Sequence, residues 1–104
     1  MNIEFEKEYL SELYYKGKCS DKKHRFQPDV IMKYKLRIDM LNNAPNIESL
    51  FLIGSLHYEV LKGDKTGISS IRVNNQYRIE FIVSKEVDET ITVCNISELS
   101  NHYK

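Results

Sequence analysis

Two arginines, Arg72 and Arg78, are the residues of this chain whose types and spacing most directly suggest chemistry. Each lies in the middle of a short segment in which apolar and polar residues alternate, as they do in β-strands. The forked donors of guanidinium groups on a rigid sheet suit the oxygens of a phosphate. Lys62 and Lys65 precede these segments and would extend an anion site. The alternative is an ordinary solvated cluster of surface charges.

Histidine and tyrosine side chains are the available proton carriers. They are His57, Tyr58, His102 and Tyr103. RNA can be cut without a metal when the ribose 2′-hydroxyl attacks its own phosphate, which requires a base, an acid and cations around the phosphorane. The sequence contains no phosphate-binding glycine loop, serine-nucleophile motif or cluster of metal ligands, so we expect no metal and no other cofactor. Because chain ends usually fray, a C-terminal histidine and tyrosine without function is the simpler interpretation.

The charge balance excludes a uniformly basic protein, because 15 basic and 15 acidic residues give no net charge. The distribution is uneven, with eight basic residues between Lys16 and Arg37, a stretch that would either meet a polyanion locally or form an ordinary solvated face. Cys19 and Cys94 match no metal-binding or redox spacing and indicate free thiols. With no signal peptide and no run long enough to span a bilayer, we expect a cytoplasmic protein.

The elements that must position these residues follow from hydrophobic periodicity. In chain order they are a strand near residues 2–6, a helix that stops at Gly17, a polar loop, a longer helix from about Pro28 to Asn43, and three strands within 70–74, 77–83 and 91–93. We therefore predict an α+β fold over residues 1–104, a single domain with the order β-α-α-β-β-β. In this sandwich the two helices pack on one face of an antiparallel sheet.

The longer helix carries two apolar stripes on nearly opposite sides. One consists of Val30, Ile31, Tyr34, Ile38 and Leu41, and the other of Met32, Leu36 and Met40. We expect the sheet to cover one stripe and the first helix the other. The alternative is that one stripe docks a protein partner.

The turn between the two arginine-bearing strands fixes their register. Cross-strand partners share a face, so Val73 must oppose Tyr77, and the loop between them has three residues, with an asparagine in a left-handed conformation. Arg72 then opposes Arg78 on the face that we expect to be open to solvent. Because opposed like charges repel, either Glu80 or a bound anion should balance the pair.

Three segments of this chain have the form of known sequence motifs. They read Leu61-Lys62-Gly63-Asp64, Ser70-Ile71-Arg72-Val73-Asn74 and Gln76-Tyr77-Arg78-Ile79-Glu80-Phe81. They resemble the motifs LKGD, SIRIN and QWRI-F of HigB-type toxins, which belong to the RelE/ParE superfamily of toxin–antitoxin modules. The motif match covers about Leu56 to Phe81, and the order of elements fits the family along the whole chain.

The resemblance implies a RelE-like fold and a small ribosome-dependent endoribonuclease that cuts messenger RNA during translation. It also implies neutralisation by a helix-turn-helix antitoxin. By this resemblance, Arg78 would contact the scissile phosphate, and Lys62 corresponds to the lysine of the family's LKGD motif. Tyr77 stands where relatives usually have tryptophan.

The proton carriers depart from the family pattern. Relatives commonly end in Tyr-His, whereas this chain ends His102-Tyr103-Lys104, and Glu59 and Val60 separate His57-Tyr58 from Leu61. The base and the acid therefore remain unassigned among His57, His102 and Tyr103. Two other functions remain open: inhibition of DNA gyrase by a ParE-like toxin, and a non-catalytic module that only binds an antitoxin.

Overall fold

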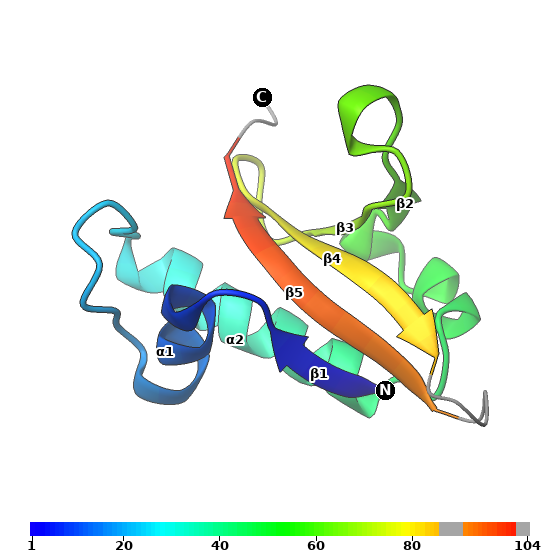
Figure 1. Ribbon diagram of the computed structural model, residues 1–104, viewed down its shortest axis with the longest axis horizontal. Helices are drawn as coiled ribbons and strands as arrows, with labels where there is room; N and C mark the ends of the chain where they lie inside the picture. The colour runs from blue at the N-terminus through cyan, green and yellow to red at the C-terminus, as the bar shows by residue number, and fades with distance from the viewer. Residues whose placement is uncertain (86–90, 102–104) are drawn as a thin grey trace.

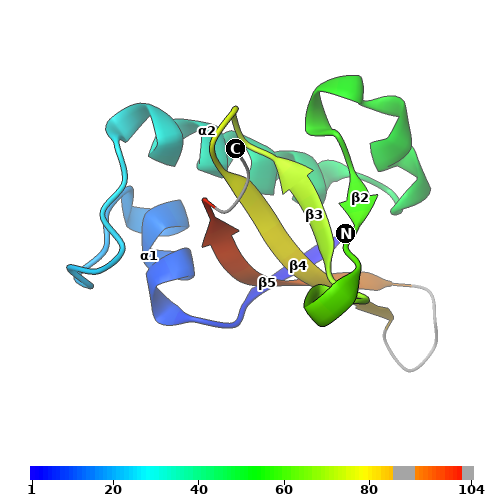
Figure 2. The same ribbon diagram turned by 90° about the horizontal axis from the view of Figure 1, so that it is seen from above.

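A computed structural model describes residues 1–85 and 91–101 of the chain. Its elements in chain order are β1 (Asn2–Phe5), α1 (Glu8–Lys16), α2 (Pro28–Asn43), the 3₁₀ turns η1 (Glu48–Leu52) and η2 (Gly54–Leu56), β2 (Glu59–Val60), the 3₁₀ turn η3 (Gly63–Lys65), β3 (Ser69–Arg72), β4 (Arg78–Lys85) and β5 (Thr92–Ser100). The strands form one sheet in the order β1-β5-β4-β3-β2 (Figure 1). Both helices lie on the same side of it (Figure 2), which confirms the predicted α+β sandwich. The predicted element order lacks β2, a strand of two residues that is too short to show a period in the sequence.

The core lies between the helices and the sheet. Its fully buried side chains include Leu10 and Leu13 of α1, Tyr34, Ile38 and Leu41 of α2, and Ile71, Ile79, Phe81, Cys94 and Ile96 of the strands. Each such apolar side chain contributes about 1.5–3 kcal/mol through burial. The Tyr34 hydroxyl donates a hydrogen bond of 2.8 Å to the carbonyl of Leu10, so the one polar atom of that large side chain is satisfied where α2 crosses α1.

The two helices begin and end close to the predicted positions. Gly17 ends α1 in the left-handed conformation, with φ 72°, and its N–H bonds the carbonyl of Leu13. Pro28 opens α2, where its missing N–H is not needed, and Ala44 ends the helix in an extended conformation before Pro45. Among the described residues, no helix is long and apolar enough to span a membrane.

The N-terminal strand is parallel to its neighbour. Asn2–Phe5 of β1 pairs in parallel with the segment from Val93 to Ile96 of β5, whereas the other strand pairs are antiparallel. The prediction of a wholly antiparallel sheet is therefore wrong at this edge. The two strands belong to opposite ends of the chain, so no hairpin fixes their direction, and a period of two carries no information about it.

The second apolar stripe of α2 is largely uncovered. Met32 is 58% exposed and Leu36 is 52% exposed, while Met40 is half-buried. The expectation that α1 would cover this stripe is wrong, because α1 has only 9 residues and buries its apolar side chains in the same core as the first stripe. An exposed apolar stripe therefore remains on the outer side of α2.

The β3–β4 hairpin has the predicted register. Ile71 pairs with Ile79 and Arg72 with Arg78, and the N–H of Val73 bonds the carbonyl of Tyr77 at 3.0 Å. The expected left-handed asparagine is absent from this loop. Instead the Asn74 side-chain oxygen accepts hydrogen bonds from the backbone of Gln76 and Tyr77 at 2.9 and 2.8 Å, so a side chain closes the turn.

Candidate active site

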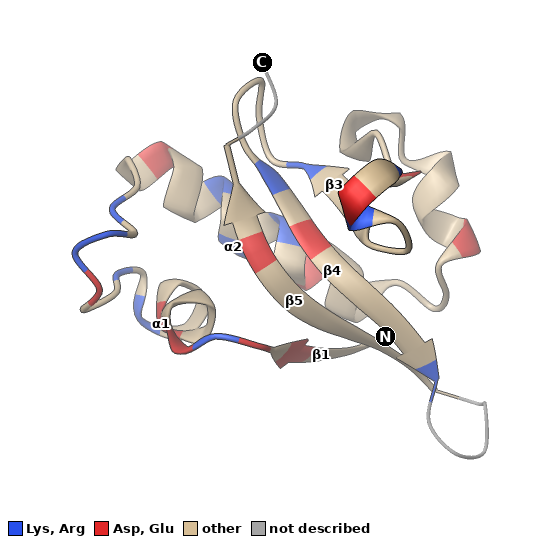
Figure 3. Ribbon diagram, turned by 45° about the horizontal axis from the view of Figure 1, so that its top comes forward, with Lys and Arg blue, Asp and Glu red and all other residues tan. Residues whose placement is uncertain are grey.

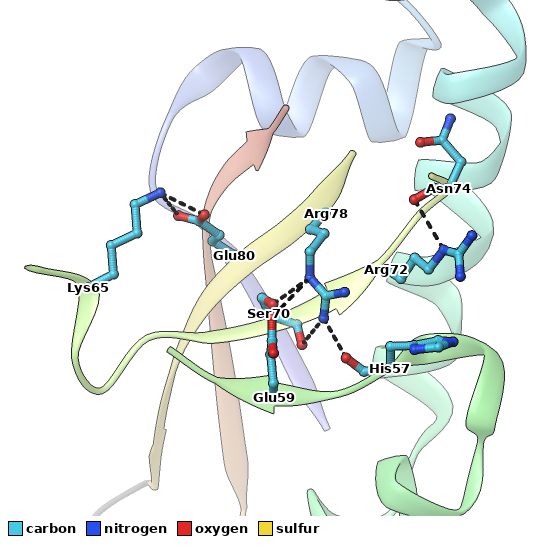
Figure 4. A network of polar contacts seen from close by, with 8 residues as sticks. All are labelled: His57, Glu59, Lys65, Ser70, Arg72, Asn74, Arg78 and Glu80. Atoms are coloured by element: carbon cyan, nitrogen blue, oxygen red, sulfur yellow. Dashed lines mark hydrogen bonds and ion pairs between the residues drawn. The ribbon is translucent and has the colours of Figure 1, made fainter. Parts of the chain in front are cut away.

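The arginine-bearing face of the sheet is not open to solvent at its centre. Arg78 is 8% exposed and Glu80 is 2% exposed, although both point away from the apolar core. The prediction of a solvent-facing Arg78 is therefore wrong. The chain between η2 and β3 returns along this face, so that β2 extends the sheet beside β3 and η3 brings Lys65 to Glu80 (Figure 4).

The Arg78 guanidinium is held by groups on two neighbouring segments (Figure 4). Its Nε donates to Ser70 Oγ at 2.8 Å, and its Nη2 donates to the Ser70 carbonyl at 3.3 Å and to the His57 carbonyl. Glu59 adds a carboxylate oxygen at 3.6 Å from Nε, an ion pair in which the glutamate is half exposed. Because β3 and the turn before β2 supply these acceptors, the cation has a fixed position on the sheet.

The backbone at His57 explains why its carbonyl reaches Arg78. His57 ends η2 in the left-handed conformation, with φ 44° and ψ 51°, and it is the one non-glycine residue with positive φ in the described parts of the chain. Such a conformation is uncommon for a residue with a Cβ atom and persists where surrounding contacts hold it. His57 is exposed to solvent, while its backbone carbonyl accepts a hydrogen bond from Arg78.

Glu80 is paired with the lysine that ends η3. Lys65 Nζ donates to the two carboxylate oxygens of Glu80 at 3.1 and 2.8 Å. Figure 3 shows acidic positions at the middle of both β4 and β5, and the strand register places Glu98 directly opposite Glu80. Lys65 therefore compensates the charge of a carboxylate that is almost completely buried. The sequence pattern had instead predicted that Lys65 would extend an anion site.

Arg72 takes a different direction from its cross-strand partner. Its Nε donates to the Asn74 carbonyl at 3.2 Å, and its Nη2 bonds Asn75 Oδ1. Its own carbonyl accepts a hydrogen bond of 3.0 Å from Nε of Arg37 on α2. The two arginines therefore do not form one anion site: Arg78 faces the His57 turn and Arg72 faces the hairpin loop and α2.

Comparison with known proteins identifies the family. Residues 3–94 match the family described as RelE-like toxin of type II toxin-antitoxin system HigB. The chain belongs to the HigB-like toxin family. It is 34% identical over 82 residues to Toxin HigB-1 of Vibrio cholerae serotype O1, a match that spans 78% of this chain and 82% of the relative. The family resemblance carried by the three motifs is confirmed, and a type II toxin has a protein antitoxin as its partner.

The HigB-like chain also resembles a solved structure along nearly its whole length. The YoeB/ParE toxin from Agrobacterium tumefaciens superposes with a TM-score of 0.60, covering 99% of this chain and 100% of that one. The sequence identity is 19%, so this similarity concerns the fold alone. It agrees with the arrangement of two helices on one face of the sheet.

Of the remaining candidate residues of the HigB-like site, Lys62 and Tyr77 make no hydrogen bond or ion pair with the Arg78 side chain within the described parts of the chain. Lys62 is exposed immediately before η3 and makes no side-chain hydrogen bond to the described residues. Tyr77 is half-buried, and its ring packs edge-on against Phe26 with centroids 5.4 Å apart. His102 and Tyr103 lie outside the described residues.

Cysteine and metal chemistry gain no support from the HigB-like structure. Burial raises the pKa of the Cys94 thiol to about 11 and also raises the pKa of Cys19, so both thiols stay protonated near neutral pH. Within residues 1–85 and 91–101, no group of three or more His, Cys, Asp and Glu side chains is placed to hold a metal ion.

Two residues that contact Arg78 were missed by sequence reasoning. Ser70 lies beside Arg78 on the same face of the sheet, and the alternation of Ser70, Ile71 and Arg72 carried the signal that would have found it. Glu59 had no such signal, because only the left-handed turn at His57 brings β2 to Arg78.

Proposed function

We propose that this HigB-like chain is a ribosome-dependent endoribonuclease that cuts messenger RNA in the cytoplasm without a metal ion. The observation that carries the proposal is the Arg78 guanidinium, buried on the sheet and held by Ser70 and the His57 carbonyl. Fixed cations that are already oriented toward developing negative charge stabilise a transition state more than mobile ones do. Family membership and the motif around Arg78 support the same reading.

In the proposed reaction a base removes the proton of a ribose 2′-hydroxyl, and the O2′ atom attacks the adjacent phosphorus. The bond from phosphorus to the 5′-oxygen of the next nucleotide breaks, and an acid gives that oxygen a proton. The products are a 2′,3′-cyclic phosphate and a 5′-hydroxyl. Arg78 and Lys62 are proposed to stabilise the charge on the phosphorane, with His57, His102 and Tyr103 as candidates for base and acid.

Glu59 gives the phosphate a way to reach Arg78. Its carboxylate lies 3.6 Å from Arg78 Nε and its side chain is 51% exposed, so this ion pair is long and screened by solvent. A phosphate can form short, charge-assisted hydrogen bonds to a guanidinium, which are stronger than this contact of 3.6 Å. We propose that the RNA phosphate displaces Glu59, while Ser70 and His57 continue to hold the guanidinium.

Cleavage of a defined transcript on purified ribosomes tests this proposal. Primer extension should give discrete in-frame cuts with the wild-type protein and none with Arg78→Ala. A 2′-deoxynucleotide at the cut position should abolish that cut, because the attacking oxygen is gone. Inhibition of DNA gyrase with intact transcripts would favour the ParE-like alternative instead.

The exposed stripe of α2 supports a second proposal, that an apolar helix of the antitoxin docks there. Met32 and Leu36 line a shallow groove of about 310 Å³ together with Pro28 and Ile31, and the charged residues Lys35 and Asp39 border it. An amphipathic helix fits such a surface with apolar residues three and four positions apart. A helix-turn-helix antitoxin is the partner that the family resemblance implies. If the chain only binds such a partner, it docks here and cuts no transcript.

A further inference from the structure

We propose that Lys33, Arg37 and Arg72 form a second RNA-phosphate site, at the end of the β3–β4 hairpin beside α2. This inference rests on the proposed function and deepens it, since it locates where the RNA backbone continues beyond Arg78. The site lies in a cavity of about 360 Å³. The polar residues that line the cavity are Lys33, Arg37, Ser55, Arg72, Asn74 and Asn75.

The cavity is cationic and is not neutralised by the protein. Three of its lining residues carry a positive charge, and none carries a carboxylate. In the described parts of the chain, none of the ion pairs involves Lys33, Arg37 or Arg72. Like charges gathered around one hollow repel one another, and a bound anion would relieve this repulsion.

Backbone groups of the hairpin fix the two guanidinium groups. Nε of Arg37 bonds the Arg72 carbonyl at 3.0 Å, and Nε of Arg72 bonds the Asn74 carbonyl at 3.2 Å. Three donor atoms make no hydrogen bond to any described residue: Nη2 of Arg37, Nη1 of Arg72 and Nζ of Lys33. Donors that are positioned but not used suit the oxygens of a phosphodiester.

The position of the cavity favours a nucleic-acid strand. Arg72 is the direct cross-strand partner of Arg78, so a backbone phosphate bound here and one bound at Arg78 would lie on the same end of the same hairpin. Lys33 and Arg37 are four residues apart on α2 and therefore share a face of the helix. They also belong to the basic stretch between Lys16 and Arg37, and in the proposed site these two residues of the stretch bind a polyanion.

The test measures how salt weakens the binding of a short single-stranded 2′-O-methyl RNA, which cannot be cleaved through its 2′-oxygen. For single strands, the slope of log K against log salt is about −0.7 for each phosphate neutralised. The double variant Lys33→Gln/Arg37→Gln should therefore lose about 1.4 from the magnitude of this slope. Lys33→Gln alone should lose about 0.7, and it disturbs no hydrogen bond of the described fold.

The matched control is Lys16→Gln/Lys35→Gln, which removes the same charge from the end of α1 and from another face of α2. An unchanged slope in this control supports the site. Equal losses in both double variants, or no saturable binding by the wild-type protein, would overturn it. The RNA assignment would also fail if the variants lost only antitoxin binding.

The outcome is separable from that of the proposed function. A protein that binds RNA through Lys33 and Arg37 but cuts no transcript keeps this site and refutes the nuclease. A protein that cuts transcripts but binds RNA equally well after both substitutions refutes this site and keeps the nuclease.

Discussion

Arg72 and Arg78 are directly opposed across β3 and β4, yet their guanidinium groups turn to different partners. Arg78 is held by Ser70 and the His57 carbonyl, and Arg72 by Asn74 and Asn75. The divergence relieves the repulsion that the register alone would produce. For the RNA strand that we propose, it provides two cations at separate positions instead of one shared site.

Removing the negative charge of Glu59 should strengthen RNA binding. An exposed ion pair is worth roughly 0.2–1 kcal/mol, so Glu59→Gln should raise affinity for uncleavable RNA by up to about fivefold. Fluorescence anisotropy measures this directly. Asp64→Asn, an exposed carboxylate in η3, makes the same change of net charge and should have a smaller effect. Equal effects of the two substitutions would mean that Glu59 does not compete with the phosphate.

Removing the charge of Lys65 should destabilise the fold. Lys65→Met leaves the carboxylate of Glu80, which is 2% exposed, without its lysine. Because Lys65 itself is 37% exposed and screened by solvent, we expect a loss of about 1–2 kcal/mol, less than for a fully buried pair. Urea unfolding measures the loss, and the double variant Lys65→Met/Glu80→Gln should recover part of it. No recovery would show that Lys65 does not stabilise the fold through Glu80.

Polar substitutions on the outer stripe of α2 should separate antitoxin binding from stability. Met32→Ser and Leu36→Ser replace exposed side chains, so the free energy of unfolding should change by no more than about 0.5 kcal/mol. Binding of the antitoxin, measured by calorimetry, should weaken. Leu41→Ala serves as the buried control on the same helix and should destabilise the protein by about 2–5 kcal/mol. Unchanged antitoxin affinity after both serine substitutions would place the antitoxin elsewhere.

Alkaline pH should weaken the fold through Tyr9. Burial raises the pKa of Tyr9 from 10.0 to about 12, although its hydroxyl also accepts a hydrogen bond from the N–H of Leu99. A raised folded pKa means that the stabilisation is complete below about pH 10 and is lost as the pH rises toward about 12. Urea unfolding as a function of pH should show this loss, and Tyr9→Phe should reduce it. An identical pH profile in the variant would contradict the assignment to Tyr9.

Sequence patterns predicted much of the fold because local physics decides those features. Pro28, Gly17 and the Ala44-Pro45 pair fix the helix limits, and the alternation around Val73 and Tyr77 fixes the hairpin register. The direction of β1 depends on which distant strand it joins, so its own residues do not encode it.

The candidate site was harder to predict because side-chain direction and burial depend on distant segments. The register placed Arg78 correctly, but its burial follows from a left-handed turn at His57, a conformation that is uncommon for residues other than glycine. The partner of Glu80 follows from η3, which lies far from β4 in the chain. The uncovered stripe at Met32 and Leu36 could not be distinguished by periodicity from a covered one.

The rate of messenger-RNA cleavage by an Arg78→Lys variant tests the central claim most directly. Lysine keeps the positive charge but lacks the planar fork that bonds Ser70 and, in the proposed reaction, would also bond a phosphate. Single-turnover cleavage on programmed ribosomes should slow by about a hundredfold or more, while circular dichroism shows a folded protein. Cleavage at the wild-type rate by this folded variant would contradict a role for the Arg78 guanidinium in the reaction.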